Sequence, residues 1–215
     1  ATGSSKAFKL RGGTGQDSLT GGAGSDIITG GDAVDTIVGN AGADSITGGA
    51  GDDIITGGDG TDTFNVDSGT DTLNDLGGSS GGENDVVIIS AGATVNANNI
   101  VSFVATSATQ NNSTDAGNAV LTAKSGAGRT ISVANATGSS KAFTLVGSDG
   151  NDSLTGGAGD DIISVTSAGH ANADILDGGA GTDTLVLSYG THTLTSENKI
   201  VNIDNINLST SGSGT

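Results

Sequence analysis

A nine-residue repeat runs from Gly12 to Asn74 and restricts the fold of this chain more than any other feature. The clearest copies read GGAGSDIIT, starting at Gly21, and GGAGDDIIT, starting at Gly48. The eighth position of each copy is apolar, and the sixth position is always aspartate. These aspartates are Asp17, Asp26, Asp35, Asp44, Asp53, Asp62 and Asp71. A constant period of this length predicts a repeat architecture, in which each repeat packs mainly against its neighbours.

The same pattern returns in a second block, and a longer duplication lies on top of it. The sixth-position aspartates of the second block are Asp152, Asp161, Asp174 and Asp183. Residues 1–29 and 136–164 agree at 22 of 29 positions. We therefore divide the chain into a first repeat block over residues 1–83, a Thr-, Ala- and Asn-rich β segment over 84–135, a second repeat block over 136–188 and a C-terminal β segment over 189–215. The duplication predicts that these segments belong to a longer array of similar modules.

Each repeat is expected to form a glycine-rich loop of six residues followed by a strand of three. Glycines at positions one, two and four permit the positive φ angles that a tight turn needs. The Thr, Ile, Leu and Val residues of the tail favour a strand. Two repeats would form one coil, so that loops 18 residues apart stack and the eighth-position side chains meet in a thin core. The predicted fold is all-β, with right-handed parallel β-roll (β-solenoid) blocks joined by further short-stranded β segments.

The composition allows such a fold only if something neutralises its acidity. The 215 residues include 24 acidic and 7 basic side chains, which gives a net charge of −17, and aromatic residues make up 2%. Such a composition is typical of disorder unless a cation binds and small aliphatic residues build the core. The acidity argues against nucleic acid as a partner. No apolar run is long enough to insert into a membrane, and the absence of cysteine excludes thiolate metal sites.

The stacked aspartates predict a column of calcium sites along each edge of the roll. Stacking places Asp17 above Asp35 and Asp26 above Asp44, and such carboxylates repel one another unless a cation lies between them. Ca²⁺ takes six or more oxygen ligands in flexible geometry, whereas Mg²⁺ needs a tight octahedron and zinc prefers Cys or His. The expected ligands are all the sixth-position aspartates of both blocks together with the loop glycines Gly13, Gly15, Gly22, Gly24, Gly49, Gly51, Gly58, Gly60, Gly157 and Gly159.

These nonapeptides resemble the repeats-in-toxin (RTX) family, whose motif is G-G-x-G-x-D-x-U-x with an apolar residue at U. The resemblance implies a parallel β-roll, several bound Ca²⁺ ions and type I secretion of an unfolded chain that folds outside the cell. In composition, the stretches between the repeats resemble RTX surface-layer proteins and giant adhesins. Ala33 replaces the fourth glycine of its loop, which predicts a weaker site there, and Asn40 and Ser148 replace second glycines.

On these grounds we expect a calcium-binding structural protein of the bacterial cell surface and not an enzyme. The sequence has no serine-hydrolase, zinc-protease or phosphate-loop motif. Three roles remain open: a self-assembling S-layer or extracellular filament subunit, a calcium-stiffened spacer of a secreted adhesin, and the secretion module of an enzyme or toxin. The expected partners are further copies of the chain and cell-surface polysaccharide, and the expected location is extracellular.

Overall fold

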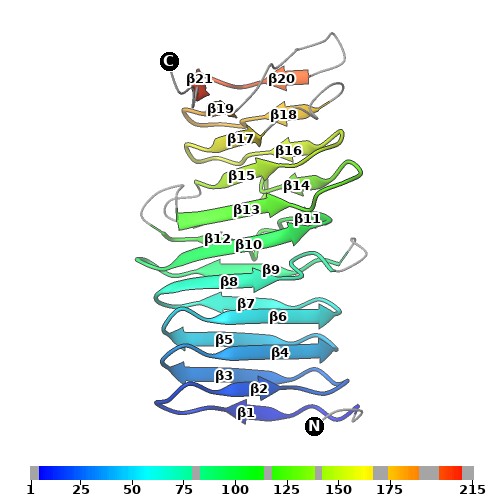
Figure 1. The fold of residues 1–215 in the computed structure, drawn as a ribbon, viewed down its shortest axis with the longest axis vertical. Coiled ribbons are helices and arrows are strands. Elements are labelled where there is room, and N and C mark those ends of the chain that lie inside the picture. The colour runs from blue at the N-terminus through cyan, green and yellow to red at the C-terminus, as the bar shows by residue number, and fades with distance from the viewer. Residues whose placement is uncertain are drawn as a thin grey trace, which may run out of the picture.

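The computed structural model describes residues 5–78, 83–113, 118–138, 142–166, 174–188 and 199–209. In these residues, short β-strands follow one another in coils that stack from the N-terminal to the C-terminal end of the molecule (Figure 1). Neighbouring strands are parallel in every pair described. The predicted parallel β-solenoid is therefore confirmed. None of the described residues form a helix long and apolar enough to cross a membrane.

The strands belong to three parallel sheets, and the chain moves from one sheet to another with each successive strand. The ten-stranded sheet contains, in order, β2 (Ser18–Thr20), β4 (Thr36–Ala41), β6 (Ile54–Asp59), β8 (Thr70–Asn74), β10 (Thr94–Ile100), β13 (Ala119–Ala123), β15 (Thr144–Gly147), β17 (Ile162–Thr166), β19 (Thr184–Ser188) and β21 (Asn205–Ser209). The six-stranded sheet contains β1 (Lys9–Arg11), β3 (Ile27–Asp32), β5 (Ser45–Ala50), β7 (Thr63–Val66), β9 (Val86–Ile89) and β12 (Gln110–Asn111). The five-stranded sheet contains β11 (Ser102–Val104), β14 (Thr130–Ser132), β16 (Ser153–Thr155), β18 (Ile175–Asp177) and β20 (Lys199–Val201).

The strands of the first block are longer than the sequence predicts. β3, β4, β5 and β6 each have six residues, because the first three residues of the next repeat continue the strand. Gly31 pairs with Gly49 in this extension, although both have positive φ angles of 127° and 111°. The expected division into a six-residue loop and a three-residue strand is therefore wrong for these repeats. Glycine has no Cβ, so it can keep a ladder pairing at a backbone angle that other residues avoid.

The eighth-position side chains form the core, as predicted. Ile28 pairs with Ile46, and Ile46 pairs with Phe64, in the six-stranded sheet. All three are fully buried. Residues on either side of the eighth position point outward in both sheets. In β6, for example, Ile54 is 44% exposed while Ile55 beside it is completely buried. This alternation is the period-two pattern of a strand with one buried face.

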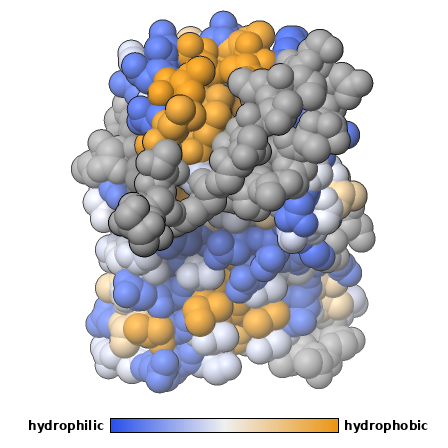
Figure 2. All heavy atoms as spheres, turned by 45° about the horizontal axis from the view of Figure 1, so that its top comes forward, coloured by the Kyte–Doolittle hydropathy of each residue, from blue (hydrophilic) through white to orange (hydrophobic). Residues whose placement is uncertain are grey.

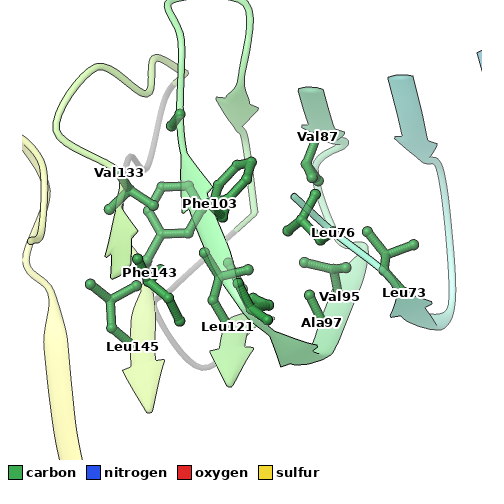
Figure 3. Close-up of a cluster of buried hydrophobic side chains, with 14 of the residues drawn as sticks. Leu73, Leu76, Val87, Val95, Ala97, Phe103, Leu121, Val133, Phe143 and Leu145 are labelled. Carbon is green, nitrogen blue, oxygen red and sulfur yellow. The ribbon is translucent and has the colours of Figure 1, made fainter. Parts of the chain in front are cut away.

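The middle segment continues the same solenoid with a different core. In the ten-stranded sheet β10 pairs with β8, β13 with β10 and β15 with β13. Asp71 pairs with Val95, which in turn pairs with Ala119, and both apolar residues are fully buried. Apolar residues thus replace the aspartate column here. Together with Phe103 and Phe143, they belong to a buried hydrophobic cluster (Figure 3).

Hydrophobic side chains also gather at the C-terminal end of the solenoid (Figure 2). The edge strand β21 carries Ile206 and Leu208, which are 56% and 69% exposed. The sheets run across the boundaries of the four sequence segments, since β8 and β10, and likewise β13 and β15, pair across them. The division of the chain into four segments stays a prediction.

Candidate metal centre

The sixth-position aspartates form two ladders of buried carboxylates along the solenoid. Each lies immediately before a strand, except Asp71, which lies within β8. Asp17, in the first loop, is half-buried. The others are at most 3% exposed: Asp26, Asp35, Asp44, Asp53, Asp62, Asp71, Asp152, Asp161, Asp174 and Asp183. Burial of an ionised carboxylate is costly unless hydrogen bonds or a cation compensate it.

Hydrogen bonds between coils supply part of that compensation. The backbone N–H of Asp17 donates to Oδ1 of Asp35 at 2.8 Å, and the N–H of Asp35 donates to Oδ1 of Asp53 at the same distance. On the other edge the N–H of Asp26 donates to Oδ1 of Asp44 at 2.7 Å. The N–H of Asp44 likewise donates to Oδ1 of Asp62 at 2.8 Å. The stacking predicted at 18-residue intervals is therefore confirmed.

The second carboxylate oxygen, Oδ2, distinguishes two kinds of loop. In loops whose second residue has an ordinary φ angle, the N–H of that residue donates to Oδ2, except in the loop of Asp71, where Asp67 is the second residue and Oδ2 has no partner. The donors are Gly13, Gly22, Ser148 and Gly157, at 2.6–2.8 Å. In loops whose second residue has a positive φ angle, Oδ2 has no hydrogen-bond partner although it is buried. The second residues of these loops are Gly31, Asn40, Gly49, Gly58 and Gly179.

Six aspartate Oδ2 atoms are therefore buried without a hydrogen-bond donor. They belong to Asp35, Asp44, Asp53, Asp62, Asp71 and Asp183. A lone carboxylate oxygen in such a position needs either a proton or a cation. Native proteins contain few buried unsatisfied polar atoms, so their regular recurrence in this column points to a repeated ligand.

The glycine at position one leaves room for this Oδ2 atom and for a carbonyl oxygen of the next coil beside it. Asp35 Oδ2 and the backbone carbonyl oxygen of Gly48 both lie against Gly30, in the space that a Cβ would fill. The same arrangement recurs at Gly39, where Asp44 Oδ2 meets the carbonyl of Gly57. Two oxygen atoms that converge in this way repel each other unless a cation lies near both. The residues present therefore fit a hard cation with oxygen ligands, and Ca²⁺ is the ion that accepts such a set most readily.

Burial and neighbouring carboxylates raise the pKa of several ladder aspartates. Burial has the largest effect at Asp62 and Asp71, and together with the negative charges on adjacent coils it raises the pKa of each to about 7. Burial likewise raises the pKa of Asp161 to about 6. The backbone N–H donors lower the pKa in each case but only in part. Near neutral pH these carboxylates are therefore poised to bind either a proton or a metal ion.

Two further aspartates extend the ladders beyond the sequence prediction. Asp85 is fully buried, and its Oδ1 accepts the N–H of Asp62 at 2.8 Å, while its Oδ2 accepts the N–H of Gly77 at 2.7 Å. Asp204 accepts the N–H of Asp183 at 2.8 Å. Both are followed two residues later by an apolar residue, as in the repeat, but lack the preceding glycine pattern. The position-one glycines were also missed, because their contribution is a carbonyl that every residue type has.

The predicted loop glycines fall into distinct conformations. Gly49, Gly51, Gly58 and Gly60 all have positive φ angles. Gly13, Gly22 and Gly157 are the N–H donors described above, and Gly15, Gly24 and Gly159 occupy position four without a positive φ angle. Ala33 adopts φ of 68° in place of glycine, a strained angle for a residue with a Cβ. Whether its loop binds calcium more weakly stays a prediction.

Two acidic residues outside the ladders, Asp52 and Asp160, accept backbone hydrogen bonds. Asp52 Oδ1 accepts the N–H of Thr70, and Asp160 Oδ1 accepts the N–H of Thr182, each at 2.8 Å. Among the described residues no group of three or more Asp, Glu or His side chains has the geometry of a metal site. Any ion in the ladders would therefore depend on backbone carbonyls as well as on carboxylates.

Comparison with known families agrees with this geometry. Four segments match the RTX calcium-binding nonapeptide repeat: residues 9–37, 38–73, 144–167 and 168–186, which together make up half of the chain. No curated protein matches the chain. The matched segments contain the sixth-position aspartates of both blocks and end before the edge strand β21.

Proposed function

Because the chain belongs to the RTX calcium-binding nonapeptide repeat family, we propose that it is a secreted, calcium-dependent structural protein of the bacterial cell surface. Its proposed role is that of a self-assembling S-layer or extracellular filament subunit, whose folding and assembly depend on Ca²⁺. The role is mechanical and non-enzymatic. Secretion is typical of RTX repeat proteins, and calcium is abundant outside the cell.

The unpartnered Oδ2 atoms of the two ladders carry this proposal. In the first block the proposed ligands are these carboxylates and the carbonyl oxygens of position-one glycines such as Gly48 and Gly57. Asp85, in the segment that follows, continues the ladder after Asp62 and is proposed as a further ligand. In the second block Asp183 has the same unpartnered Oδ2 atom. Asp152, Asp161 and Asp174 are proposed as ligands on their places in the ladders, and Oδ2 of Asp152 and of Asp161 already accepts a backbone N–H. Bound Ca²⁺ supplies positive charge between coils whose carboxylates otherwise repel one another.

The residues themselves prepare the site. The backbone N–H donors hold Oδ1 of each carboxylate at a fixed depth in the loop, so that Oδ2 is left for the ion. Positive φ angles at position two turn the N–H of that peptide away from Oδ2. The pairing of Gly31 with Gly49 keeps adjacent loops in register. The sites are therefore built by the coil-to-coil hydrogen bonds and depend on the folded solenoid.

Self-assembly is supported by the charge of the surface and by the exposed apolar side chains of β21. A net charge of −17 keeps copies apart unless divalent ions neutralise or bridge them. Among the described residues β21 pairs with β19 alone, and it exposes Ile206 and Leu208. An edge strand with exposed apolar side chains favours pairing with another chain.

A calcium-stiffened adhesin spacer is the second candidate, and the unbroken ten-stranded sheet favours it. That sheet continues from the first repeat block through the middle segment into the second block. Such a continuous solenoid would transmit force along a monomeric rod as well as it would serve a lattice. The same calcium sites are required in both cases.

Two measurements test the proposal. Native mass spectrometry in millimolar Ca²⁺ should show several bound ions per chain, and a chain that binds none would exclude the calcium-binding role. Negative-stain microscopy and light scattering, with and without chelator, then separate the two structural roles. Ordered sheets or filaments that dissolve in chelator support assembly. A monodisperse monomer at millimolar Ca²⁺ and high protein concentration favours the spacer.

A further inference from the structure

The loop over residues 124–129 is built like a repeat loop, although its sequence does not match the motif. β14 pairs with β16 so that Thr130 lies opposite Ser153, an offset of 23 residues. The same offset places Arg129 opposite Asp152, whereas β13 pairs with β15 at an offset of 24, which places Lys124 opposite Ser148, so this loop has one residue more than the next. The backbone N–H of Arg129 donates to Oδ1 of Asp152 at 2.7 Å, as each ladder aspartate does to the next. Arg129 therefore occupies the aspartate position of its loop.

The guanidinium of Arg129 turns back onto the carbonyl oxygens of its own loop. Its Nε donates to the carbonyl oxygen of Lys124 at 3.0 Å, and its Nη2 donates to that of Ser125 at 3.2 Å. Both carbonyls lie at the start of the loop, where Lys124 faces Ser148, the second residue of the next loop. The carbonyl of Lys124 also accepts the hydroxyl of Ser148, from the next coil, at 3.0 Å. The loop thus presents carbonyl oxygens to a positive charge, as the calcium loops are proposed to do.

Arginine remains charged at all accessible pH values, and its planar group presents several donors in a fixed arrangement. At this position it brings a cation on the side chain where the other loops place an anion. A calcium ion in this loop would lack the sixth-position carboxylate and would face a positive charge. We propose that Arg129 is a built-in cation, which replaces Ca²⁺ in loop 124–129 and ends the metal column of the second block at Asp152. This inference rests on the proposed calcium binding of the ladders.

The neighbouring coil supports an end to the column at this point. Ser102 pairs with Thr130, so Val101 precedes the pairing as Arg129 does. On the opposite ladder Val95 and Ala119 take the aspartate position and are fully buried. Both ladders are therefore interrupted between the two repeat blocks. It follows that the second block has its own metal array. The guanidinium of Arg129 bounds that array on one side and takes the place of a metal ion from solution.

Exchange of Arg129 for aspartate tests the proposal by ion counting. Arg129→Asp gives the loop a sixth-position carboxylate, and Lys124→Asp makes the same change of charge at the start of the same loop. In saturating Ca²⁺, native mass spectrometry should show one more ion on Arg129→Asp than on the wild type, and the wild-type number on Lys124→Asp. An unchanged count on a folded Arg129→Asp chain would overturn the proposal. A wild-type chain without bound calcium would instead refute the proposed function.

A second pair of variants tests the guanidinium contacts and remains decisive if Arg129→Asp does not fold. Arg129→Gln and Lys124→Gln each remove one positive charge from the loop. With Ca²⁺ present, the amides of β14 in Arg129→Gln should exchange hydrogen about tenfold faster than in the wild type, because charge-assisted bonds to two carbonyls are lost. Lys124→Gln should match the wild type. Equal exchange in the two variants would overturn the proposal.

Discussion

Two adjacent isoleucines in β6 give the sharpest test of the solenoid core. Ile54 points outward and is 44% exposed, whereas Ile55 is fully buried and pairs with Ile37 and Leu73 in the coils on either side. Replacement of either residue by alanine removes the same atoms from the same strand. The two variants therefore differ only in which face of the sheet loses them.

The burial of each side chain sets the expected loss of stability. Ile→Ala removes three carbon atoms, worth roughly 2.4 kcal/mol at about 0.8 kcal/mol for each buried carbon. At Ile55 the cavity left in a core one side chain thick adds to this, for a total of about 3–4 kcal/mol. At Ile54 about half of the transfer energy applies and no cavity forms, so the expected loss is about 1 kcal/mol. The lower strand propensity of alanine affects both variants alike.

Urea unfolding in excess Ca²⁺, followed by circular dichroism, measures both variants under conditions in which the metal sites are filled. The midpoint of Ile55→Ala should fall well below that of Ile54→Ala, by the equivalent of about 2–3 kcal/mol. Ile27 and Ile28 in β3 are 51% and 0% exposed and form an independent second pair. If the two members of each pair lose the same stability, the assigned inward and outward faces are wrong.

Three further results are expected. Asp53→Asn should weaken calcium binding roughly tenfold or more in a titration, because it removes a buried ladder carboxylate. Asp52→Asn should change the calcium affinity by no more than about twofold, because Asp52 is exposed and bonds only to backbone. Gly49→Ala should destabilise the fold by more than about 1 kcal/mol in the same urea assay, since a Cβ at its φ of 111° would meet a backbone carbonyl; a wild-type midpoint would contradict the assigned backbone. The pKa values of Asp62 and Asp71 are raised to about 7 from an ordinary 3.8, so the folded state binds protons more tightly than the unfolded state does. In chelator the β signal in circular dichroism should therefore increase as the pH falls from about 7 towards about 4. A decrease of the β signal would refute this pH dependence.

The nine-residue period predicted the repeat blocks well because it fixes both the strand and its inward side chain. Apolar residues at Ile28, Ile37 and Ile46 needed only the period-two rule to be placed in the core. The middle segment was harder to predict, because its coils have no common length. β8 and β10 are related by 24 residues and β11 and β14 by 28, so no fixed period marks them. Short strands were expected in the middle segment. That they continue the sheets of the repeat blocks could not be predicted, because it depends on pairing between strands far apart in the sequence.

The candidate sites show the same limit at the level of single residues. The stacking of aspartates at 18-residue intervals followed from the repeat. Asp85 was missed because the coil that contains it is longer, so that it lies 23 residues after Asp62. Arg129 was missed because it breaks the motif, and its role is visible only when the pairing of β14 with β16 places it at the aspartate position. Metal ligands that are backbone carbonyls cannot be predicted from residue type, because every residue has one.

The most direct test of the central claim is an anomalous difference map from crystals grown in millimolar Ca²⁺. We expect peaks along both aspartate ladders, close to the Oδ2 atoms of residues such as Asp35 and Asp44 and to the carbonyls of the position-one glycines. Loop 124–129 should have no peak. A well-ordered solenoid with no calcium in either ladder would contradict the account.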